Sequence, residues 1–351
     1  MKDNSIMELR AAAGDEGRRL DRILRKALPR MPLSRIHRLL REGRIRVDGR
    51  RAAAGDRVRA GQIIRVPAED ADPAVPGRTE SQVETESAAR PGPGNLDIIF
   101  ESPHILALNK PAGLAVHGPH SLDTLARTYL GSRIPPSLSF SPGPLHRLDK
   151  PTSGIVVFSV SLAGARFFSA LLREHSLIKR YLAVVEGVIG EAGVWEDKVI
   201  RDTERRKTLR AEDAEAGEAP GGKPARTRFK PLSRGKDFTL LELEPDTGRT
   251  HQIRAQAAFH GHPLAGDRKY GGGASPIPKG RDGTGPDISF LLHAWRLGIP
   301  SLPVEKNTHP KEARPVLPSL LEAPLPAYFR ETLLRLFGER RILCIFPALR
   351  E

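Results

Sequence analysis

An aspartate at the start of a buried strand is the residue of this sequence best placed to do chemistry. Asp149 lies in a polar turn, residues 146–154, that contains Pro151 and Gly154. The apolar run of residues 155–158 follows directly and predicts a buried strand. A carboxylate held there can act as a nucleophile or a base, but aspartates in such turns also serve only to bond neighbouring backbone N–H groups. The residue types alone leave both interpretations open.

The spacing of this turn resembles a family signature. His146-Arg147-Leu148-Asp149, two variable positions and then Thr152-Ser153-Gly154 are similar to the signature of the RluA family of RNA pseudouridine synthases. Other segments resemble further motifs of that family in the same order: residues 109–114 with 116–117, 179–181, 222–225 with Thr227, 248–254, 261–264, 266–267 and 292–294. The ordered matches extend across residues 95–300.

The resemblance implies a reaction that needs no cofactor. In it, the bond between N1 of uracil and C1′ of ribose breaks, the base turns, and it is rejoined through C5. Because no hydride, phosphate or oxygen is transferred, we expect no cofactor, no nucleotide and no metal. Cys344 is the only cysteine, and the sequence has no dinucleotide fingerprint or phosphate-binding loop. His146, His251 and His293 have irregular spacing, so we do not interpret them as a metal site.

The resemblance implies three catalytic residues, Asp149, Tyr181 and Arg254. Asp149 attacks C1′, as a carboxylate does in retaining glycosidases, or removes a proton from C2′, and the sequence does not choose between these steps. Arg254 keeps the carboxylate charged in a water-poor pocket. Tyr181 stacks on the uracil and relays the proton that C5 loses. Without the family motifs, Arg254 would be interpreted as an ordinary surface arginine and Tyr181 as a core residue.

Three substrate-binding residues are also implied by the resemblance. Arg147 enters the space that a flipped uridine leaves in the RNA; the alternative for Arg147 is a phosphate contact or a salt bridge. Arg249 contacts an RNA phosphate or holds its loop, and Leu292 forms an apolar wall beneath the base.

A hydrolytic glycosidase would need a second carboxylate, and no motif places one near Asp149. The pattern therefore favours isomerisation over hydrolysis.

The net charge predicts a polyanionic partner. The chain of 351 residues carries 56 Lys and Arg against 42 Asp and Glu, a formal charge of +14, which favours nucleic acid or an acidic membrane surface. Residues 18–66 contain sixteen basic and four acidic side chains, so most of the excess lies there. The sequence has no apolar run of about eighteen residues and no signal peptide. We therefore expect a cytoplasmic protein that binds RNA and no membrane.

The basic segment, residues 17–67, is predicted to fold as a small RNA-binding module. Apolar residues at helical spacing predict two helices, and Gly43 ends the second. Asp48-Gly49 predicts a hairpin turn after them. This order of elements resembles the S4-like module first described in a ribosomal protein. The candidate RNA-binding residues, three apart on the second helix, are Arg35, Arg38 and Arg41; the alternative is an arginine-rich surface without a ligand.

The rest of the chain predicts a flexible acidic linker, residues 68–94, and a catalytic domain, residues 95–345. The linker has few large apolar residues and cannot bury enough surface to order itself. In the catalytic domain, strands are predicted at residues 98–100, 105–108, 155–160, 181–185 and 238–243, helices at 122–129, 162–172 and 253–258, and surface loops at 211–224 and 271–286. We expect an α+β fold with a mixed, mainly antiparallel sheet, which is also the fold that the resemblance implies.

The expected function is the conversion of uridine to pseudouridine in structured RNA. Ribosomal RNA of the large subunit is the expected substrate, because the basic module resembles those of family members that act there, and transfer RNA is the alternative. A non-catalytic RNA-binding or ribosome-assembly factor, or an RNA chaperone driven only by charge, would have no reason to keep an Asp149 that repels phosphate. The sequence gives no indication of the oligomeric state.

Overall fold

The computed structural model describes residues 6–68, 96–134, 136–213, 222–278, 288–299 and 317–350. The chain forms two compact units. The first comprises Met1–Asn95, Arg127–Gly143 and Ser159–Ala165, and the second comprises Leu96–Ala126, Pro144–Phe158 and Arg166–Glu351. Nearly all of the predicted linker, residues 214–221 of the first predicted surface loop and residues 279–286 of the second lie outside the described residues.

Together with residues 6–15, the basic segment forms a helical pair on a small sheet. Its elements are β1 (Ile6–Arg10), η1 (Ala13–Asp15), α1 (Leu20–Ala27), α2 (Leu33–Arg41), β2 (Arg46–Val47), β3 (Arg50–Arg51) and β4 (Ile63–Pro67), and the strands pair in the order β1-β4-β2-β3. Leu20, Ile23, Leu24, Ile36 and Leu39 are fully buried, as their helical spacing predicts. Strand β1 precedes the predicted module and pairs with β4 along its whole length.

Two turns in this segment confirm the sequence signals. Asp48 and Gly49 have φ values of 47° and 74°, the left-handed pair that a tight hairpin turn requires, and they join β2 to β3. Gly43, at φ 68°, follows the end of α2. The apolar faces of the two helices therefore pack on the sheet, and most of the arginines remain exposed.

A buried aspartate binds a distant segment of the same unit. Asp15 has no exposed surface, and its carboxylate accepts hydrogen bonds from the Ser137 hydroxyl at 2.7 Å, the Ser139 hydroxyl at 2.5 Å and the Leu138 amide at 2.8 Å. The amide of Ala12 adds a fourth hydrogen bond at 3.0 Å. Burial disfavours the charged carboxyl, but these hydrogen bonds outweigh it and lower the pKa of Asp15 below its usual range.

Asp15→Asn is expected to lower the free energy of unfolding at neutral pH by about 2 kcal/mol, because an amide accepts fewer hydrogen bonds than a carboxylate. Since the folded-state pKa of Asp15 is depressed, its contribution is complete above about pH 4 and is lost as the pH falls through the lower folded-state value. The difference between wild type and variant should therefore shrink on acidification. Denaturant unfolding between neutral and acidic pH measures it, with the exposed Asp237→Asn as control. An equal difference at every pH would contradict this account of Asp15.

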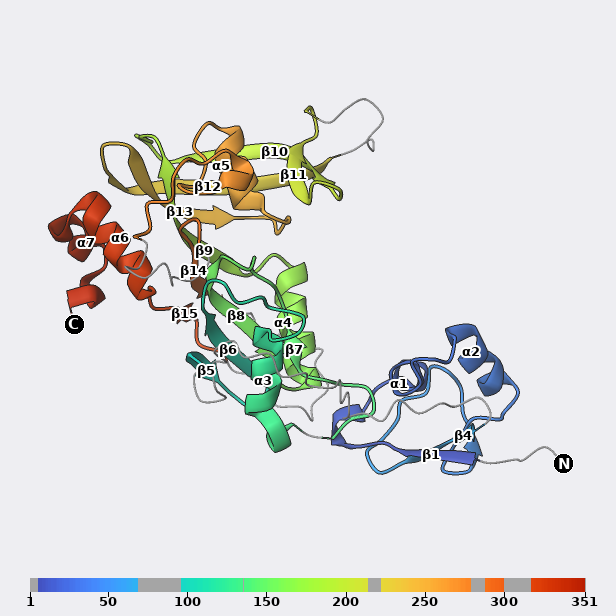
Figure 1. Cartoon of the computed structure of the whole chain (residues 1–351). Coiled ribbons are helices and arrows are strands. Elements are labelled where there is room, and N and C mark those ends of the chain that lie inside the picture. Colours follow the sequence, from blue (N-terminus) through green and yellow to red (C-terminus); the bar gives the residue numbers. More distant parts are fainter. Residues whose placement is uncertain are drawn as a thin grey trace, which may run out of the picture. The chain divides into compact units, whose positions relative to one another are not determined.

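The larger sheet is mixed and mainly antiparallel, which confirms the predicted α+β class (Figure 1). Its strands are β5 (Ile98–Glu101), β6 (Ile105–Lys110), β7 (Gly143–Pro144), β8 (Ser153–Ser159), β9 (Ile178–Glu186), β10 (Gly193–Asp202), β11 (Lys207–Arg210), β12 (Lys223–Arg234), β13 (Phe238–Pro245), β14 (Leu292–Gly298) and β15 (Leu320–Glu322). The order is β11-β10-β12-β13-β9-β14-β8-β6-β5, with β15 on β14 and β7 on β8. The contact between β8 and β14 is parallel.

Helices cover both faces of this sheet. They are α3 (Leu122–Leu130), α4 (Leu162–Arg173), α5 (Gln252–Phe259), α6 (Ala327–Phe337) and α7 (Glu339–Ile345), with short turns η3 (Gly131–Arg133), η4 (Arg268–Tyr270) and η5 (Pro347–Arg350). Leu182 and Val184 of β9 pack with α6 and α7, whereas Ala183 and Val185 pack with α5. This alternation buries β9 on both faces and fixes α5 beside it. None of the helices in the described ranges is long and apolar enough to span a membrane.

Candidate active site

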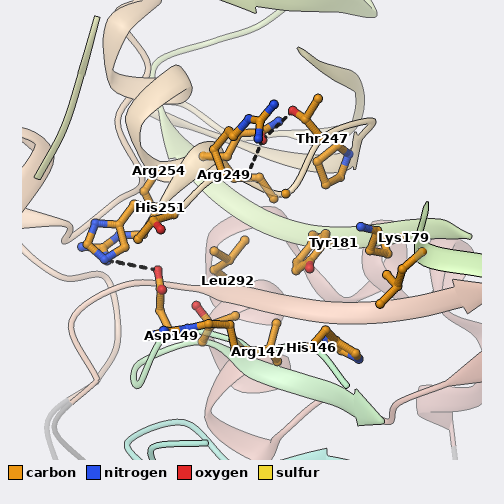
Figure 2. A pocket seen from close by; sticks show the side chains of 18 residues that line it. His146, Arg147, Asp149, Lys179, Tyr181, Thr247, Arg249, His251, Arg254 and Leu292 are labelled. Carbon is orange, nitrogen blue, oxygen red and sulfur yellow. Dashed lines mark hydrogen bonds and ion pairs between the residues drawn. The ribbon is translucent and has the colours of Figure 1, made fainter. Parts of the chain in front are cut away.

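A cavity of about 350 Å³ lies in the second unit, and Figure 2 shows its lining. The lining comes from the turn before β8, from α4, β9, the segment between β13 and α5, the start of α5, and β14. It contains six of the residues singled out for catalysis or substrate binding: Asp149, Tyr181, Arg254, Arg147, Arg249 and Leu292. Segments more than a hundred residues apart in the sequence therefore meet at one site.

The turn that carries Asp149 is fixed by backbone contacts. The amide of Thr152 donates to the Asp149 carbonyl at 3.0 Å, and the amide of Gly113 donates to the Lys150 carbonyl at 2.8 Å. Gly154 has φ 110°, and a Cβ there would lie 2.2 Å from the carbonyl oxygen of Ala294 on β14. Only glycine fits at this crossing, which explains the last residue of the motif.

A buried lysine supports the same turn from below. Lys110 has no exposed surface, and its ammonium donates to the carbonyls of Leu114 at 2.7 Å, Pro111 at 2.9 Å and Lys150 at 3.1 Å. Burial lowers the pKa of Lys110 to about 7, although the charge of Asp149 opposes this. The sequence motif around Lys110 therefore has a structural meaning, because its side chain ties two loops to the residue that follows Asp149.

Arg254 lies between two carboxylates. Its Nη1 donates to Oδ2 of Asp149 at 3.4 Å, while Nε and Nη2 donate to the two oxygens of Asp267 at 2.7 and 2.8 Å. Arg254 is 6% exposed and Asp267 is 1% exposed. The expected contact between Arg254 and Asp149 is present, but the stronger, two-pronged pair is with Asp267. Asp267 therefore fixes the guanidinium, which presents its remaining edge to Asp149.

Two aromatic rings complete the surroundings of the guanidinium. The Cζ atom of Arg254 lies 4.6 Å from the ring centroid of Phe290 and 5.1 Å from that of Tyr270. Burial disfavours the charge, but the hydrogen bonds and charge of Asp267, followed by the charge of Asp149, raise the pKa of Arg254 above its usual value. Arg254 is thus a fixed cation in a site of low exposure.

His251 is a second neighbour of Asp149. Its Nε2 lies 3.7 Å from Oδ2 of Asp149, and its Nδ1 lies 2.9 Å from the hydroxyl of Tyr270. Burial lowers the pKa of His251 to about 4, with the charge of Asp149 opposing and that of Arg254 reinforcing the shift. The imidazole is therefore neutral at pH 7. His251 also has φ 54°, so the backbone turns sharply immediately before α5 begins.

Tyr181 and Leu292 line the cavity from adjacent strands, β9 and β14. Burial, and to a smaller extent the charge of Asp149, raise the pKa of Tyr181 to about 12. The phenol is therefore protonated at neutral pH, which suits a hydrogen-bonding and stacking group. Leu292 is 5% exposed and contributes an apolar side chain to the lining. These two residues lie between Asp149 and Lys179 in Figure 2.

Arg147 and Arg249, the two other arginines of the cavity, differ in exposure and in their contacts. Arg147 is exposed at the cavity, next to the Asp149 turn. The Nε of Arg249 donates to the carbonyl of Pro224 at 3.1 Å, so this side chain holds the loop before α5 against the start of β12. Holding the loop was one of the two roles expected for Arg249.

The three histidines considered for a metal site, His146, His251 and His293, have separate partners. His146 Nε2 accepts from the amide of Val157 at 3.1 Å, and His293 Nδ1 lies 2.8 Å from the Ser153 hydroxyl. His251 is bound to Tyr270. In the part of the chain that the structure describes, no group of three His, Cys, Asp or Glu side chains is arranged to hold a metal ion.

The candidate RNA-binding arginines lie on α2 of the first unit. Arg38 and Arg41 are exposed, whereas Arg35 is half-buried. Arg38 also forms an ion pair with Glu42, with Nε 2.7 Å from Oε1. An exposed pair of this kind contributes little free energy, so an RNA phosphate can replace the carboxylate.

Comparison with known proteins identifies the family. Residues 104–259 match the model for RNA pseudouridylate synthase, and residues 18–64 match the model for the S4 domain. The chain is 32% identical over 329 residues to "Ribosomal large subunit pseudouridine synthase D" of Nitrosomonas europaea, covering 93% of this chain and 86% of that one. It is 31% identical over 338 residues to "Ribosomal large subunit pseudouridine synthase C" of Escherichia coli, covering 96% and 98%. The chain belongs to the RNA pseudouridylate synthase family.

Membership of the RNA pseudouridylate synthase family makes the protein an RNA pseudouridine synthase, an isomerase, as the motif around Asp149 predicted. The fold agrees with this assignment. A solved structure titled "Human RNA Pseudouridylate Synthase Domain Containing 4" aligns with a TM-score of 0.51 at 26% identity, covering 68% of this chain and 92% of that one.

Sequence reasoning assigned no role to Asp267, Lys110 or Tyr270, although the first two lie within matched motifs. A signal for Asp267 was present in Gly266-Asp267. Gly266 has φ 88°, and a Cβ there would lie 1.9 Å from the carbonyl oxygen of Ser289, so the motif marks a tight turn. No local pattern indicates that this turn delivers a carboxylate to Arg254, because the contact exists only in the folded chain.

Proposed function

We propose that this RNA pseudouridine synthase modifies uridines of large-subunit ribosomal RNA in the cytoplasm. Two observations support this target. The relatives that align over most of the chain are named for the ribosomal large subunit, and the basic segment matches the S4 domain. The proposed organisation is a small RNA-binding module at residues 17–67, a linker at 68–94 and a catalytic domain at 95–345.

The proposed nucleophile is Asp149, and the geometry of its carboxylate carries the proposal. Arg254 and His251 both approach Oδ2. No contact within the described ranges involves Oδ1, which leaves that oxygen available to attack C1′ of a uridine in the cavity. The C1′–N1 bond breaks as the new C1′–O bond forms, and the uracil is released as an anion that turns. C5 then bonds to C1′ as the C1′–O bond breaks, which restores the carboxylate of Asp149. Proton removal from C2′ by the same oxygen remains the alternative step.

The other cavity residues are proposed to bind the uracil, the flipped nucleotide or Asp149. Tyr181 and Leu292 form the surface on which the uracil turns, and the protonated phenol of Tyr181 is positioned to relay the proton lost from C5. Arg147 enters the space left by the flipped nucleotide. Arg249 keeps the loop before α5 closed, and Arg254 holds Asp149.

Hydrolysis of the glycosidic bond is disfavoured by the same arrangement. A glycosidase needs a second carboxylate that protonates the leaving group or activates water. Asp267 is near Arg254, but it is buried and both of its oxygens accept hydrogen bonds from the guanidinium. It is therefore not available for proton transfer, and the released base stays in the site for re-attachment.

Pseudouridine mapping of total RNA from cells with and without the gene tests the target. We expect one or more pseudouridines of large-subunit ribosomal RNA to disappear in the deletion strain and to return with the wild-type gene. A loss confined to transfer RNA would contradict the ribosomal target and leave the chemistry intact. An unchanged map would contradict an active synthase in those cells.

Replacing Arg35, Arg38 and Arg41 together by Gln in the full chain is expected to weaken RNA binding and flatten its salt dependence. Each lost phosphate contact should reduce the slope of log K against log salt by about 0.7 to 0.9. Binding titrations at several salt concentrations measure this slope. The same change at the exposed Arg330, Arg340 and Arg341 controls for total charge. Equal slopes for the two triple variants would contradict a role for α2 in RNA binding.

A further inference from the structure

Lys179 is a cation at the end of the cavity away from Asp149. It lies on β9 two residues before Tyr181, so both side chains are on the same face of the strand. Figure 2 shows Asp149 and Lys179 at opposite ends of the lining, with Leu292 and Tyr181 drawn between them. Within the described ranges, no hydrogen bond or ion pair joins the Lys179 ammonium to another residue. The cavity therefore has an acid at one end and an unpaired cation at the other.

Two carboxylates that share another lining with Lys179 are already paired. Glu244 and Asp246 line a second cavity of about 230 Å³ that Lys179 also touches. Glu244 binds Arg180 at 3.1 Å and Arg228 at 2.7 Å, and Asp246 binds Arg226 at 2.5 Å. Burial lowers the pKa of Lys179, and no carboxylate counteracts it. A half-buried ammonium without a partner is destabilising until a substrate oxygen binds it.

We propose that Lys179 binds the carbonyl oxygen of the uracil that lies opposite the glycosidic bond. This inference rests on the proposed function, in which C1′ and N1 lie at Asp149. The uracil ring then lies over Leu292 and Tyr181, and O4, the ring substituent farthest from N1, is directed toward Lys179. The ammonium donates a hydrogen bond to this oxygen.

This contact strengthens as the glycosidic bond breaks. A bond forms between Oδ1 of Asp149 and C1′, and the electron pair of the C1′–N1 bond remains on the uracil. The negative charge is delocalised over N1, O2 and O4. An ammonium that donates to O4 therefore stabilises the transition state more than the bound substrate, which is the condition for catalysis.

The same contact persists when the base turns. Exchanging N1 for C5 is a half-turn of the ring about the axis through N3 and C6, and this half-turn also exchanges O4 with O2. A carbonyl oxygen therefore faces Lys179 before and after the rotation. Cytosine carries an amino group at C4, which cannot accept a hydrogen bond from an ammonium, so Lys179 also selects uridine against cytidine.

Lys179→Met and Lys179→Arg, with the exposed Lys230→Met as control, test the inference in the full chain. The substrate is total RNA from cells lacking the gene, labelled with tritium at C5 of its pyrimidines, because it contains every natural target. We expect Lys179→Met to lower the single-turnover rate of tritium release roughly a hundredfold with little change in RNA affinity. Lys179→Arg should recover much of the rate, because it keeps a charged donor.

A pH series separates this role from a structural one. The titratable and charged groups that share a lining with Lys179 come from several elements. Nearby are Tyr181 on β9 itself, His146 and Arg147 before β8, His175 after α4, Arg228 on β12, and Glu244 with Asp246 at the end of β13; farther along the cavity are Asp149, Arg249, His251 and Arg254. Lys179→Arg leaves all of these in place, so a shift of the alkaline limb reports on residue 179. The wild-type rate should fall on the alkaline side as the ammonium loses its proton, and this limb should move to higher pH in Lys179→Arg. A Lys179→Met rate close to wild type, or an alkaline limb unmoved in Lys179→Arg, would overturn the inference. A wild-type protein that releases no tritium would instead contradict the proposed function.

Discussion

Replacing Asp149 with Asn is expected to abolish pseudouridine formation while RNA binding is retained. The amide has nearly the shape of the carboxylate, so the turn that holds it should persist, but it has no negative charge with which to attack C1′ or to remove a proton from C2′. Loss of the group that reacts with substrate lowers turnover on the order of 10⁴-fold or more. RNA affinity should not fall, because removing a negative charge cannot weaken contacts to phosphate. Tritium release from C5 and binding titrations measure the two quantities.

Asp237→Asn is the matched control, because Asp237 is an exposed carboxylate outside the cavity lining. It should release tritium at the wild-type rate. If the Asp149 variant turned over at a comparable rate, Asp149 would be removed from the mechanism. If it lost RNA affinity to the same extent as activity, its effect would be one of binding and not of chemistry.

The sequence predicted that Asp149 and Arg254 belong to one site, and the structure brings them together. Both lie in motifs with a local physical meaning. Asp149 precedes a run of apolar residues, and the structure places it in the turn before β8. Arg254 follows Gly248 in a dense polar motif, and the structure brings its Nη1 to 3.4 Å from Asp149. The predicted apolar wall, Leu292, is also in the lining. A short motif can therefore predict which side chains lie together in the folded chain.

The sequence did not reveal how these groups are held. The guanidinium is fixed by Asp267, the Asp149 turn by Lys110, and the neutral His251 by Tyr270. Lys110 lies forty positions before Lys150, whose carbonyl it binds, and neither charge nor periodicity indicates that its ammonium is fully buried. Such contacts depend on how distant loops meet, which a single sequence does not encode locally.

The fold, too, was predictable from the sequence only where the signal is local. Five strands with short apolar runs were predicted, whereas β10, β11, β12 and β14 were not. Strand β12 lacks such a run because its sequence carries three arginines, two lysines and two prolines. The structure stabilises this strand through cross-strand ion pairs. Arg226 binds Glu196 on β10 at 2.6 Å, and Arg228 binds Glu244 on β13 at 2.7 Å. A strand rich in charged residues can be predicted only when the strands that supply its ion-pair partners are known.

Arg254→Ala is expected to reduce both turnover and stability. The change leaves Asp149 without its cation and leaves Asp267, which is 1% exposed, as a buried carboxylate without a partner. Removing one member of a buried pair costs about 3–5 kcal/mol. Arg254→Lys should also be slow, because an ammonium cannot bind Asp267 with two donors and Asp149 with a third in the same geometry. Single-turnover rates measure the loss of turnover, and denaturant unfolding measures the loss of stability.

The double variant Arg254→Leu with Asp267→Leu separates catalysis from folding. Replacing both members of a buried ion pair by apolar groups of similar size is often close to neutral for stability, so unfolding should return toward the wild-type value. Turnover should remain low, because Asp149 still lacks a fixed guanidinium. Recovery of activity together with stability would show that Arg254 serves the fold alone. Near-normal turnover in Arg254→Ala would show that another cation, or none, supports Asp149.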